Sequence, residues 1–188
     1  MSTPPTTCFA EGTLITTQGG PVRIEDLKLG DLVVTLCSGI QPIRWIGWRY
    51  VDFPNLPEAE QSQNCPILIM AGALGENIPN QDLTVSARHG VIAGPAFTTA
   101  WNLVNGHTIM ALENSGPITY YHLELDGFQI ISANGMGAES FVDVGNRGAF
   151  THQLQASDLE LALVGASNPR LRKDRGCPGQ KMVGRRFH

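Results

Sequence analysis

Glycine spacing is the feature of this chain that most constrains its fold. Glycine occurs 21 times in 188 residues and falls repeatedly between short apolar segments. Such segments favour β-strands joined by tight turns, because an amphipathic helix needs a longer stretch with a period of about 3.6 residues. We therefore expect an all-β domain, with predicted strands at 14–17, 32–35, 41–50, 67–70, 83–85, 91–93, 108–112, 118–125 and 129–133.

The remaining segments are predicted to be turns, loops and short helices. Single helical turns are expected at 25–27 and 100–104, and the acidic, proline-containing stretch 52–64 is expected to be an exposed loop. Ser157 and Glu160 form a capping-box pattern before a leucine-rich run, which predicts a short helix ending at Gly165.

The composition favours one folded core that needs no metal or disulfide framework. The chain has 42% hydrophobic residues and is long enough to bury a core of its own. Its four cysteines are scattered, with no CxxC pair and no histidine at zinc-ligand spacing: Cys8, Cys37, Cys65 and Cys177. We therefore predict no metal and no cofactor.

The formal net charge of −4 conceals two parts of opposite sign. Up to Val164 there are 6 basic and 16 acidic side chains, net −10; from Gly165 onwards there are 7 basic and 1 acidic, net +6. A basic tail can bind nucleic acid or an anionic membrane by counterion release. This tail has no interleaved aromatic residues for base stacking, so a tail that neutralises its own acidic domain is favoured over nucleic-acid binding.

The sequence leaves the cellular compartment open. Its first seven residues lack the basic start and apolar stretch of a secretory signal. No run approaches the roughly 20 apolar residues that a membrane-spanning helix requires. We therefore expect no membrane span, and the localisation is unknown.

The beginning of the chain combines a cysteine with a glycine-punctuated strand pattern. Cys8 opens the run CFAEGTLITT, and the next run, 21–33, contains a Gly-Asp turn before its last apolar residues. This pattern resembles the start of a Hint domain, the fold shared by Hedgehog autoprocessing domains and inteins. The resemblance implies that Cys8 is a nucleophile that attacks the carbonyl of Thr7 and converts the Thr7–Cys8 peptide bond into a thioester. The alternative is a packing role, because cysteine is readily buried as a small apolar residue.

A second motif follows the strand predicted at 83–85. Ser86 and His89 lie three residues apart, where the second Hint motif carries a threonine and a histidine. The resemblance implies that His89 donates a proton to the departing nitrogen and that Ser86 helps to hold the scissile amide. Taken alone, this spacing is common and equally describes a histidine in a turn after a strand.

The segment 120–141 resembles the closing motifs of an intein. His122 stands where inteins usually carry an aspartate, which would make it a second acid or base in the site; the alternative is a strand residue that faces solvent. The tripeptide Ala138-Glu139-Ser140 stands where an intein has Val-His-Asn. Splicing needs that asparagine to cyclise, and serine has no amide, so splicing is not expected.

Together these motifs predict a compact, pseudo-symmetric Hint fold built from β-ribbons. We expect a Hint domain at 8–146, a flank at 1–7, and an extension at 147–188 with the short helix and basic tail. The predicted function is an N-to-S acyl shift at Thr7–Cys8 in cis, followed by cleavage of the thioester by water or another small nucleophile. The alternative is a catalytically inactive Hint-fold module with a structural or interaction role.

Overall fold

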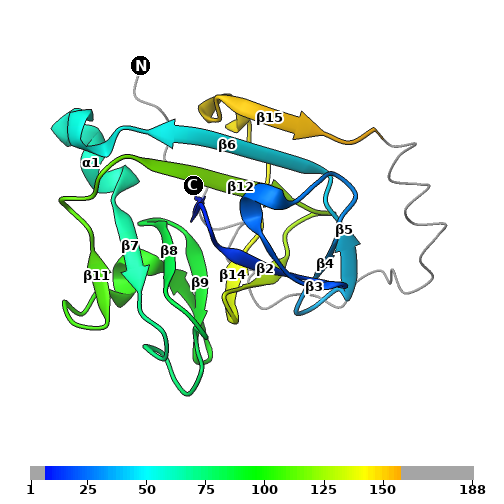
Figure 1. Ribbon diagram of the computed structural model, residues 1–188, viewed down its shortest axis with the longest axis horizontal. Coiled ribbons are helices and arrows are strands. Elements are labelled where there is room, and N and C mark those ends of the chain that lie inside the picture. The colour runs from blue at the N-terminus through cyan, green and yellow to red at the C-terminus, as the bar shows by residue number, and fades with distance from the viewer. Residues whose placement is uncertain (1–6, 158–188) are drawn as a thin grey trace.

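Most of the ordered elements are β-strands, and they form two curled sheets (Figure 1). The computed structural model describes residues 7–157. The first sheet is antiparallel, and its order is β11 (Ile109–Ala111), β7 (Pro66–Ile69), β8 (Leu83–Ser86), β1 (Phe9–Ala10), β12 (Ile118–Glu124), β6 (Trp45–Val51) and β15 (His152–Gln155).

The second sheet is also antiparallel. Its order is β10 (Ala96–Thr99), β9 (Gly90–Ala93), β14 (Met136–Glu139), β13 (Ile130–Ala133), β2 (Leu14–Thr17), β4 (Leu32–Val34) and β5 (Ile40–Pro42), and β3 (Gly20–Arg23) also pairs with β2. The chain passes from the first sheet to the second between β1 and β2, and again between β8 and β9. These two crossings lie side by side, because β1 is hydrogen-bonded to β8.

The longest strands of the first sheet, β6 and β12, pair along their whole length, and β15 pairs with the other edge of β6 (Figure 1). The fully buried Trp45 ring stacks on Phe141 at 4.7 Å between centroids and meets Phe150 edge-on at 5.0 Å. A Cβ at Gly47 would lie 2.1 Å from the Trp45 ring, so this position has room for glycine alone. This aromatic cluster also contacts His122, which pairs with Gly47 and whose ring meets that of Phe141.

The predicted all-β architecture is confirmed, with differences in detail. Each predicted strand is present, but the segment 41–50 is divided into β5 and β6. The division falls where the chain changes sheet: the Ile43 N–H donates to the carbonyl of Asp31, which directly precedes β4 of the second sheet, and the Arg44 N–H donates to the Glu124 carbonyl of the first. The predicted helical turns are present as 3-10 helices at Ile24–Asp26 and Ala100–Leu103.

The prediction of an exposed loop at 52–64 is wrong. This stretch contains a 3-10 helix at Phe53–Asn55 and the helix α1 (Glu58–Asn64), and the Phe53 and Asn64 side chains are buried. Residues 58–64 have acidic side chains in their first turn, which favour a helix start, and the Phe53 ring supplies an apolar anchor. The prolines and the acidic composition of this stretch are typical of loops, which explains the difference.

The start of the predicted C-terminal extension packs on the first sheet. Phe150 is buried against Trp45, and β15 adds an edge strand that the sequence did not predict. The helix predicted at 157–165 and the basic tail lie outside the described residues. Among residues 7–157, no helix is long and apolar enough to cross a membrane.

Candidate active site around Cys8

The strand order places Cys8 between two predicted site residues. Cys8 directly precedes β1 and is fully buried. Phe9 pairs with Val85 of β8 on one side and with Tyr121 of β12 on the other. Because both pairings are antiparallel, the residue before Phe9 lies between the residues that follow Val85 and Tyr121, which are Ser86 and His122.

Ser86 contacts the backbone of Cys8 from the β8 side. The Cys8 N–H donates to Ser86 Oγ at 2.9 Å, and the Ser86 N–H donates to the Cys8 carbonyl, also at 2.9 Å. The first of these groups is the nitrogen of the Thr7–Cys8 peptide bond. The Ser86 hydroxyl therefore touches the amide that the sequence prediction named as scissile.

His122 contacts Thr7 from the β12 side. Its Nε2 lies 3.0 Å from Thr7 Oγ1, and its Nδ1 accepts a hydrogen bond from the Leu123 N–H at 3.1 Å. Burial, and secondarily the charge of nearby His89, lowers the pKa of His122 well below its ordinary value. His122 is therefore neutral near pH 7, and with Nδ1 accepting, the ring proton is on Nε2 and donates to the Thr7 hydroxyl. The solvent-facing alternative for His122 is wrong, because its side chain is fully buried.

His89 lies in the turn that joins β8 to β9 and is fully buried. The His89 N–H donates to the Ser86 carbonyl at 3.0 Å, which closes the turn, and the His89 carbonyl accepts from Ala100 N–H at 2.9 Å. The imidazole centroid is 5.1 Å from that of His122 and 4.2 Å from the Phe9 ring. The fold thus brings Cys8, Ser86, His89 and His122 together from three separate segments.

Glu139 is a buried carboxylate that the sequence prediction did not include in the site. Its Oε1 accepts the Gly90 N–H at 2.7 Å, next to His89, and it enters from β14, which pairs with β9. A Cβ at Gly90 would lie 2.8 Å from the Glu139 carboxyl carbon and 2.3 Å from the Phe97 ring. Glycine at 90 thus allows the carboxylate to fix the turn that carries His89. The signal in the sequence was the acidic residue at the position where inteins have histidine.

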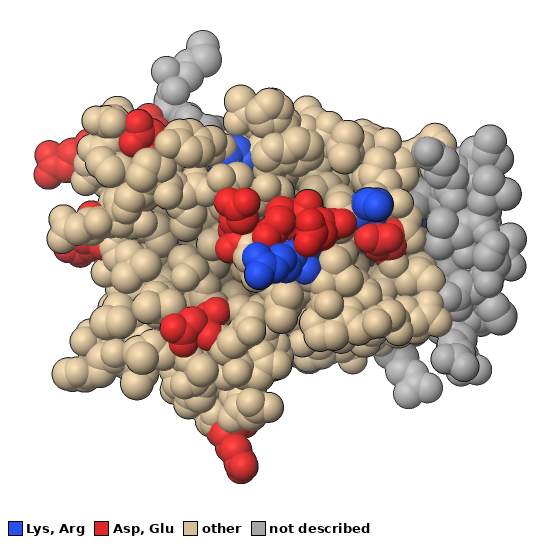
Figure 2. Space-filling model, in the orientation of Figure 1, with Lys and Arg blue, Asp and Glu red and all other residues tan. Residues whose placement is uncertain are grey.

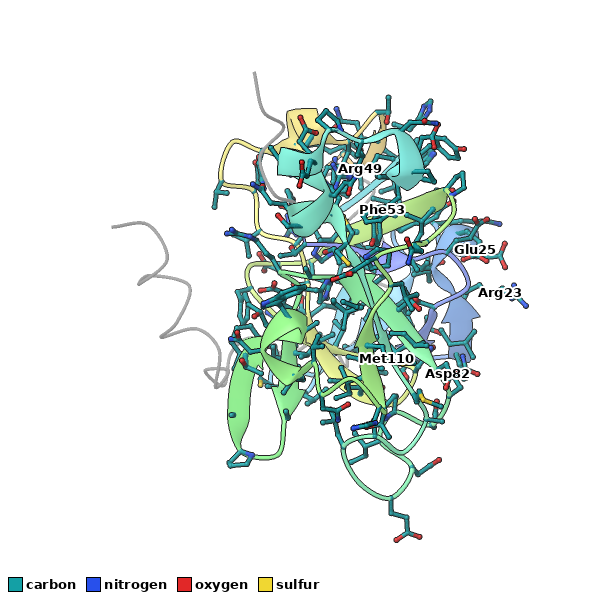
Figure 3. All side chains as sticks on the ribbon, turned by 90° about the vertical axis from the view of Figure 1, so that its left-hand side faces the viewer. Arg23, Glu25, Arg49, Phe53, Asp82 and Met110 are labelled. Carbon is teal, nitrogen blue, oxygen red and sulfur yellow. The ribbon has the colours of Figure 1, made fainter. Side chains whose placement is uncertain are left out.

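A polar network lies behind Cys8 on the side of α1. Arg49 donates to the Asn64 side chain, and the Tyr120 hydroxyl donates to the Asn64 carbonyl at 3.1 Å. Figure 3 shows Arg49 and Phe53 at the end of the molecule where α1 lies. Burial, together with the nearby charges of Cys8 and Cys65, raises the pKa of Tyr120 well above its ordinary value. Tyr120 is therefore a neutral hydrogen-bond donor near Cys8 rather than a base.

Glu25 supports the segment that follows β1. Its Oε2 accepts the Gly12 N–H at 2.8 Å, and its Oε1 lies 3.6 Å from Arg23. Figure 2 shows acidic and basic side chains gathered near the middle of one face, which is otherwise sparsely charged. Burial, and then the charges of Glu11, Glu25 and Asp26, raises the pKa of Tyr121. The Glu25 carboxylate thus holds the turn after β1 through the Gly12 N–H.

The described residues contain no group of three or more His, Cys, Asp and Glu side chains that could hold a metal ion. Cys8 and Cys65 are both reduced thiols rather than members of a disulfide. Burial, with the nearby charge of Glu113, raises the pKa of Cys65, which disfavours its thiolate. Of these two thiols, Cys8 is the one beside a candidate scissile bond.

Comparison with known proteins identifies the family. A Hint domain family model matches residues 7–145. The structure is similar to the bacterial intein-like domain from Clostridium thermocellum, at 15% identity and a TM-score of 0.53, over 72% of this chain and 99% of that one. It is also similar to a variant of the Ssp DnaB mini-intein, at 12% identity and a TM-score of 0.51, over 73% of this chain and 97% of that one. No curated protein matches the sequence significantly.

The family match covers most of the chain, and the two solved structures share its fold. The chain belongs to the Hint domain family, whose members are self-processing domains. The predicted all-β Hint fold is thereby confirmed. Residues 147–157, including β15, follow the part of the chain that the family model matches.

The buried, neutral His122 gives a prediction for the stability of the domain. In the unfolded chain its pKa is about 6.5, and in the folded chain it is lower. Its contribution to stability is therefore complete above pH 6.5 and is lost as the pH falls from there towards the folded pKa, by at most about 1.4 kcal/mol per pH unit. We expect the melting temperature to fall between pH 6.5 and 5, measured by calorimetry on the full chain.

Two variants test the source of this slope. His122→Gln removes the titrating group and is expected to flatten the pH dependence. His107→Gln changes an exposed histidine and should leave the slope as it is. Equal slopes for the native chain and His122→Gln would contradict the prediction.

Proposed function

We propose that this Hint domain cleaves its own chain at the Thr7–Cys8 peptide bond through a thioester, without splicing. The observation that carries the proposal is the hydrogen bond from the Cys8 N–H to Ser86 Oγ, because this amide is the one that an N-to-S shift must break. His122 binds Thr7 on the other side of the same bond. Polar groups on β8 and β12, the two strands that flank β1, thus contact both residues of the candidate scissile bond.

The first step is an isomerisation in which no atom is gained or lost. Cys8 Sγ attacks the Thr7 carbonyl carbon, a C–S bond forms, and the C–N bond to Cys8 breaks. The proton lost by the thiol ends on the departing nitrogen, which becomes the free amine of Cys8. An amide is more stable than a thioester, so the step needs an orienting site and an acid for the nitrogen.

His89 and Ser86 have complementary roles in this proposal. The Ser86 hydroxyl accepts the Cys8 N–H and fixes the plane of the amide relative to the thiol. His89, one turn further along the chain, supplies the proton to the nitrogen as the C–N bond breaks. Glu139 is a positioning residue, because it binds the backbone of Gly90 beside the acid.

The second step releases the segment before Cys8. Water or another small nucleophile attacks the thioester carbonyl, a carboxylate or a new acyl derivative of Thr7 forms, and the Cys8 thiol is regenerated. A surface cleft next to the site contains Ala87 and Arg88, the two residues between Ser86 and His89, together with Trp101. In this proposal the acceptor enters from this cleft, because Ala87 and Arg88 belong to the same turn as Ser86 and His89.

Splicing does not fit the residues at the end of β14. Ser140 stands where an intein has the cyclising asparagine, and its Oγ accepts the Gln129 N–H at 3.0 Å. A hydroxyl in this position has no amide nitrogen with which to form a succinimide. The reaction proposed for this chain therefore ends with cleavage at one junction.

A second candidate function is an inactive Hint module that serves as a structural or interaction domain. The observation that favours it is the complete burial of Cys8 within the hydrophobic core. Burial is compatible with attack on the adjacent carbonyl, but it hinders an external acceptor. The two functions make opposite predictions for the integrity of the Thr7–Cys8 bond.

The test is a fusion of a foreign domain in front of Ser2 of the full chain, purified and followed by intact mass with and without dithiothreitol. We expect thiol-stimulated loss of the foreign domain, with a new amino terminus at Cys8. The mass of the released fragment identifies the acceptor as water or the thiol. An unchanged mass under all conditions would reject the proposed function and leave the inactive module.

A further inference from the structure

The contact between His122 and Thr7 joins a buried side chain of β12 to the residue before the candidate nucleophile. Thr7 is partly exposed, whereas His122 has no exposed surface. Their side chains meet through Thr7 Oγ1 and His122 Nε2 at 3.0 Å. The hydroxyl of residue 7 therefore reaches into the site next to the peptide bond that the proposed function breaks.

The ring of His122 is held by one hydrogen bond and three ring contacts in addition to its contact with Thr7. Its Nδ1 accepts the Leu123 N–H, and its faces and edges meet Phe9 at 5.6 Å, Phe141 at 5.5 Å and His89 at 5.1 Å between ring centroids. Because Nδ1 acts as acceptor in the neutral ring, Nε2 is a donor aimed at residue 7. A donor that is rigid and buried is left unsatisfied when its partner is removed, and this cost is what makes it selective.

Rotation of the Thr7 side chain is coupled to the orientation of its carbonyl group. Threonine is β-branched and has restricted χ1 rotamers, so a hydrogen bond on Oγ1 limits the backbone of residue 7 as well. Ser86 restrains the amide nitrogen of Cys8 from β8, and His122 restrains the acyl side from β12. The two hydrogen bonds therefore restrain the groups on both sides of the Thr7 carbonyl carbon.

We propose that His122 is a specificity-determining residue that selects a β-hydroxyl side chain, threonine or serine, immediately before Cys8. The inference rests on the proposed function and defines its substrate class as acyl segments that end in a hydroxyl residue. A valine has the shape of threonine but offers no acceptor to Nε2. A serine keeps the acceptor and loses only a methyl group.

The cleavage test uses the same full-chain fusion with three residues at position 7. Thr7→Ser is expected to react within about twofold of the native fusion, and Thr7→Val about five- to tenfold more slowly, as the loss of one partly buried hydrogen bond predicts. In a His122→Leu background the ratio between the rates with threonine and with valine at position 7 should approach one. His122→Gln carries a donor at a similar distance from Cα and should restore part of the discrimination.

Equal rates for native and Thr7→Val fusions, or the same ratio in the His122→Leu background, would overturn the proposal. Melting temperatures of all variants are measured together with the rates, and the Thr7 series carries the test if a His122 variant fails to fold. In that case, the proposal predicts a faster cleavage rate for the folded Thr7→Ser fusion than for the folded Thr7→Val fusion.

A second measurement keeps recognition separate from chemistry. In the full chain with Cys8→Ala, long-range ¹H–¹⁵N spectra of the histidine rings are expected to show His122 as the neutral Nε2–H tautomer. Thr7→Val should move the Nε2–H resonance, and Thr7→Ser should not; an unmoved resonance in Thr7→Val would overturn the contact. If no fusion is cleaved, the proposed function and the selective role fail together, and the spectra still decide whether His122 binds the Thr7 hydroxyl.

Discussion

Replacement of Cys8 by alanine is expected to abolish thiol-stimulated cleavage of the fusion completely. The proposed thioester forms through Cys8 Sγ, and no other reduced thiol in the described residues lies beside the Thr7–Cys8 bond. Intact mass of the Cys8→Ala fusion should remain that of the uncleaved chain after overnight incubation with dithiothreitol. Loss of the foreign domain from this variant would show that another nucleophile cleaves the chain.

Cys65→Ala is the matched control for this variant. Cys65 is also a buried, reduced cysteine, and its thiol contacts the Pro66 carbonyl rather than the candidate scissile amide. Both substitutions remove a sulfur from the same core, at a cost that the melting temperature measures. Cleavage by Cys65→Ala at a rate near the native one would assign the chemistry to Cys8 and not to the loss of core volume.

Replacement of Ser86 by alanine is expected to slow cleavage by about 30- to 150-fold. In the proposed mechanism the Ser86 hydroxyl orients the departing nitrogen most strongly as the C–N bond breaks, so its removal is expected to cost about 2 to 3 kcal/mol of transition-state stabilisation. The measurement is the first-order rate of fragment release at saturating dithiothreitol. A variant that cleaves at the native rate would remove Ser86 from the mechanism.

Ser86→Thr is the control that keeps the hydroxyl. Threonine adds a methyl group at a fully buried position, so its melting temperature is measured beside that of Ser86→Ala. We expect Ser86→Thr to react far faster than Ser86→Ala, because the acceptor for the Cys8 N–H is retained. Equal, slow rates for both variants would indicate a packing role for Ser86 rather than a role of its hydroxyl.

The sequence allowed the residues of the candidate site to be named, but it did not predict which of their atoms are in contact. Cys8, Ser86, His89 and His122 were found because each stands in a short motif whose spacing depends on local strand and turn geometry. Their contacts depend on β1 lying between β8 and β12, an order that joins segments more than 70 residues apart. No local pattern fixes such a pairing, because strand order is set by the packing of both sheets.

Three findings arose only from the folded chain. Glu139 departs from the intein pattern, and the pairing of β14 with β9 places its carboxylate on the Gly90 N–H. The sequence is compatible with either a site role or a solvent-facing position for His122, and the aromatic residues packed around it bury it. The short strand β15 has weak patterning of its own, and it forms because β6 offers an edge for pairing.

The sequence by itself determined the β-rich class and the resemblance to Hint domains, because turn glycines and the strand period act over a few neighbouring residues. It also pointed to the thiol and imidazole groups that the proposed chemistry would use. The tertiary structure alone decided which atoms meet: Ser86 Oγ on the Cys8 amide, and a neutral His122 donor on the Thr7 hydroxyl. Hydrogen bonds and proton positions of this kind depend on burial and on distances of about 3 Å, and both are set by long-range packing.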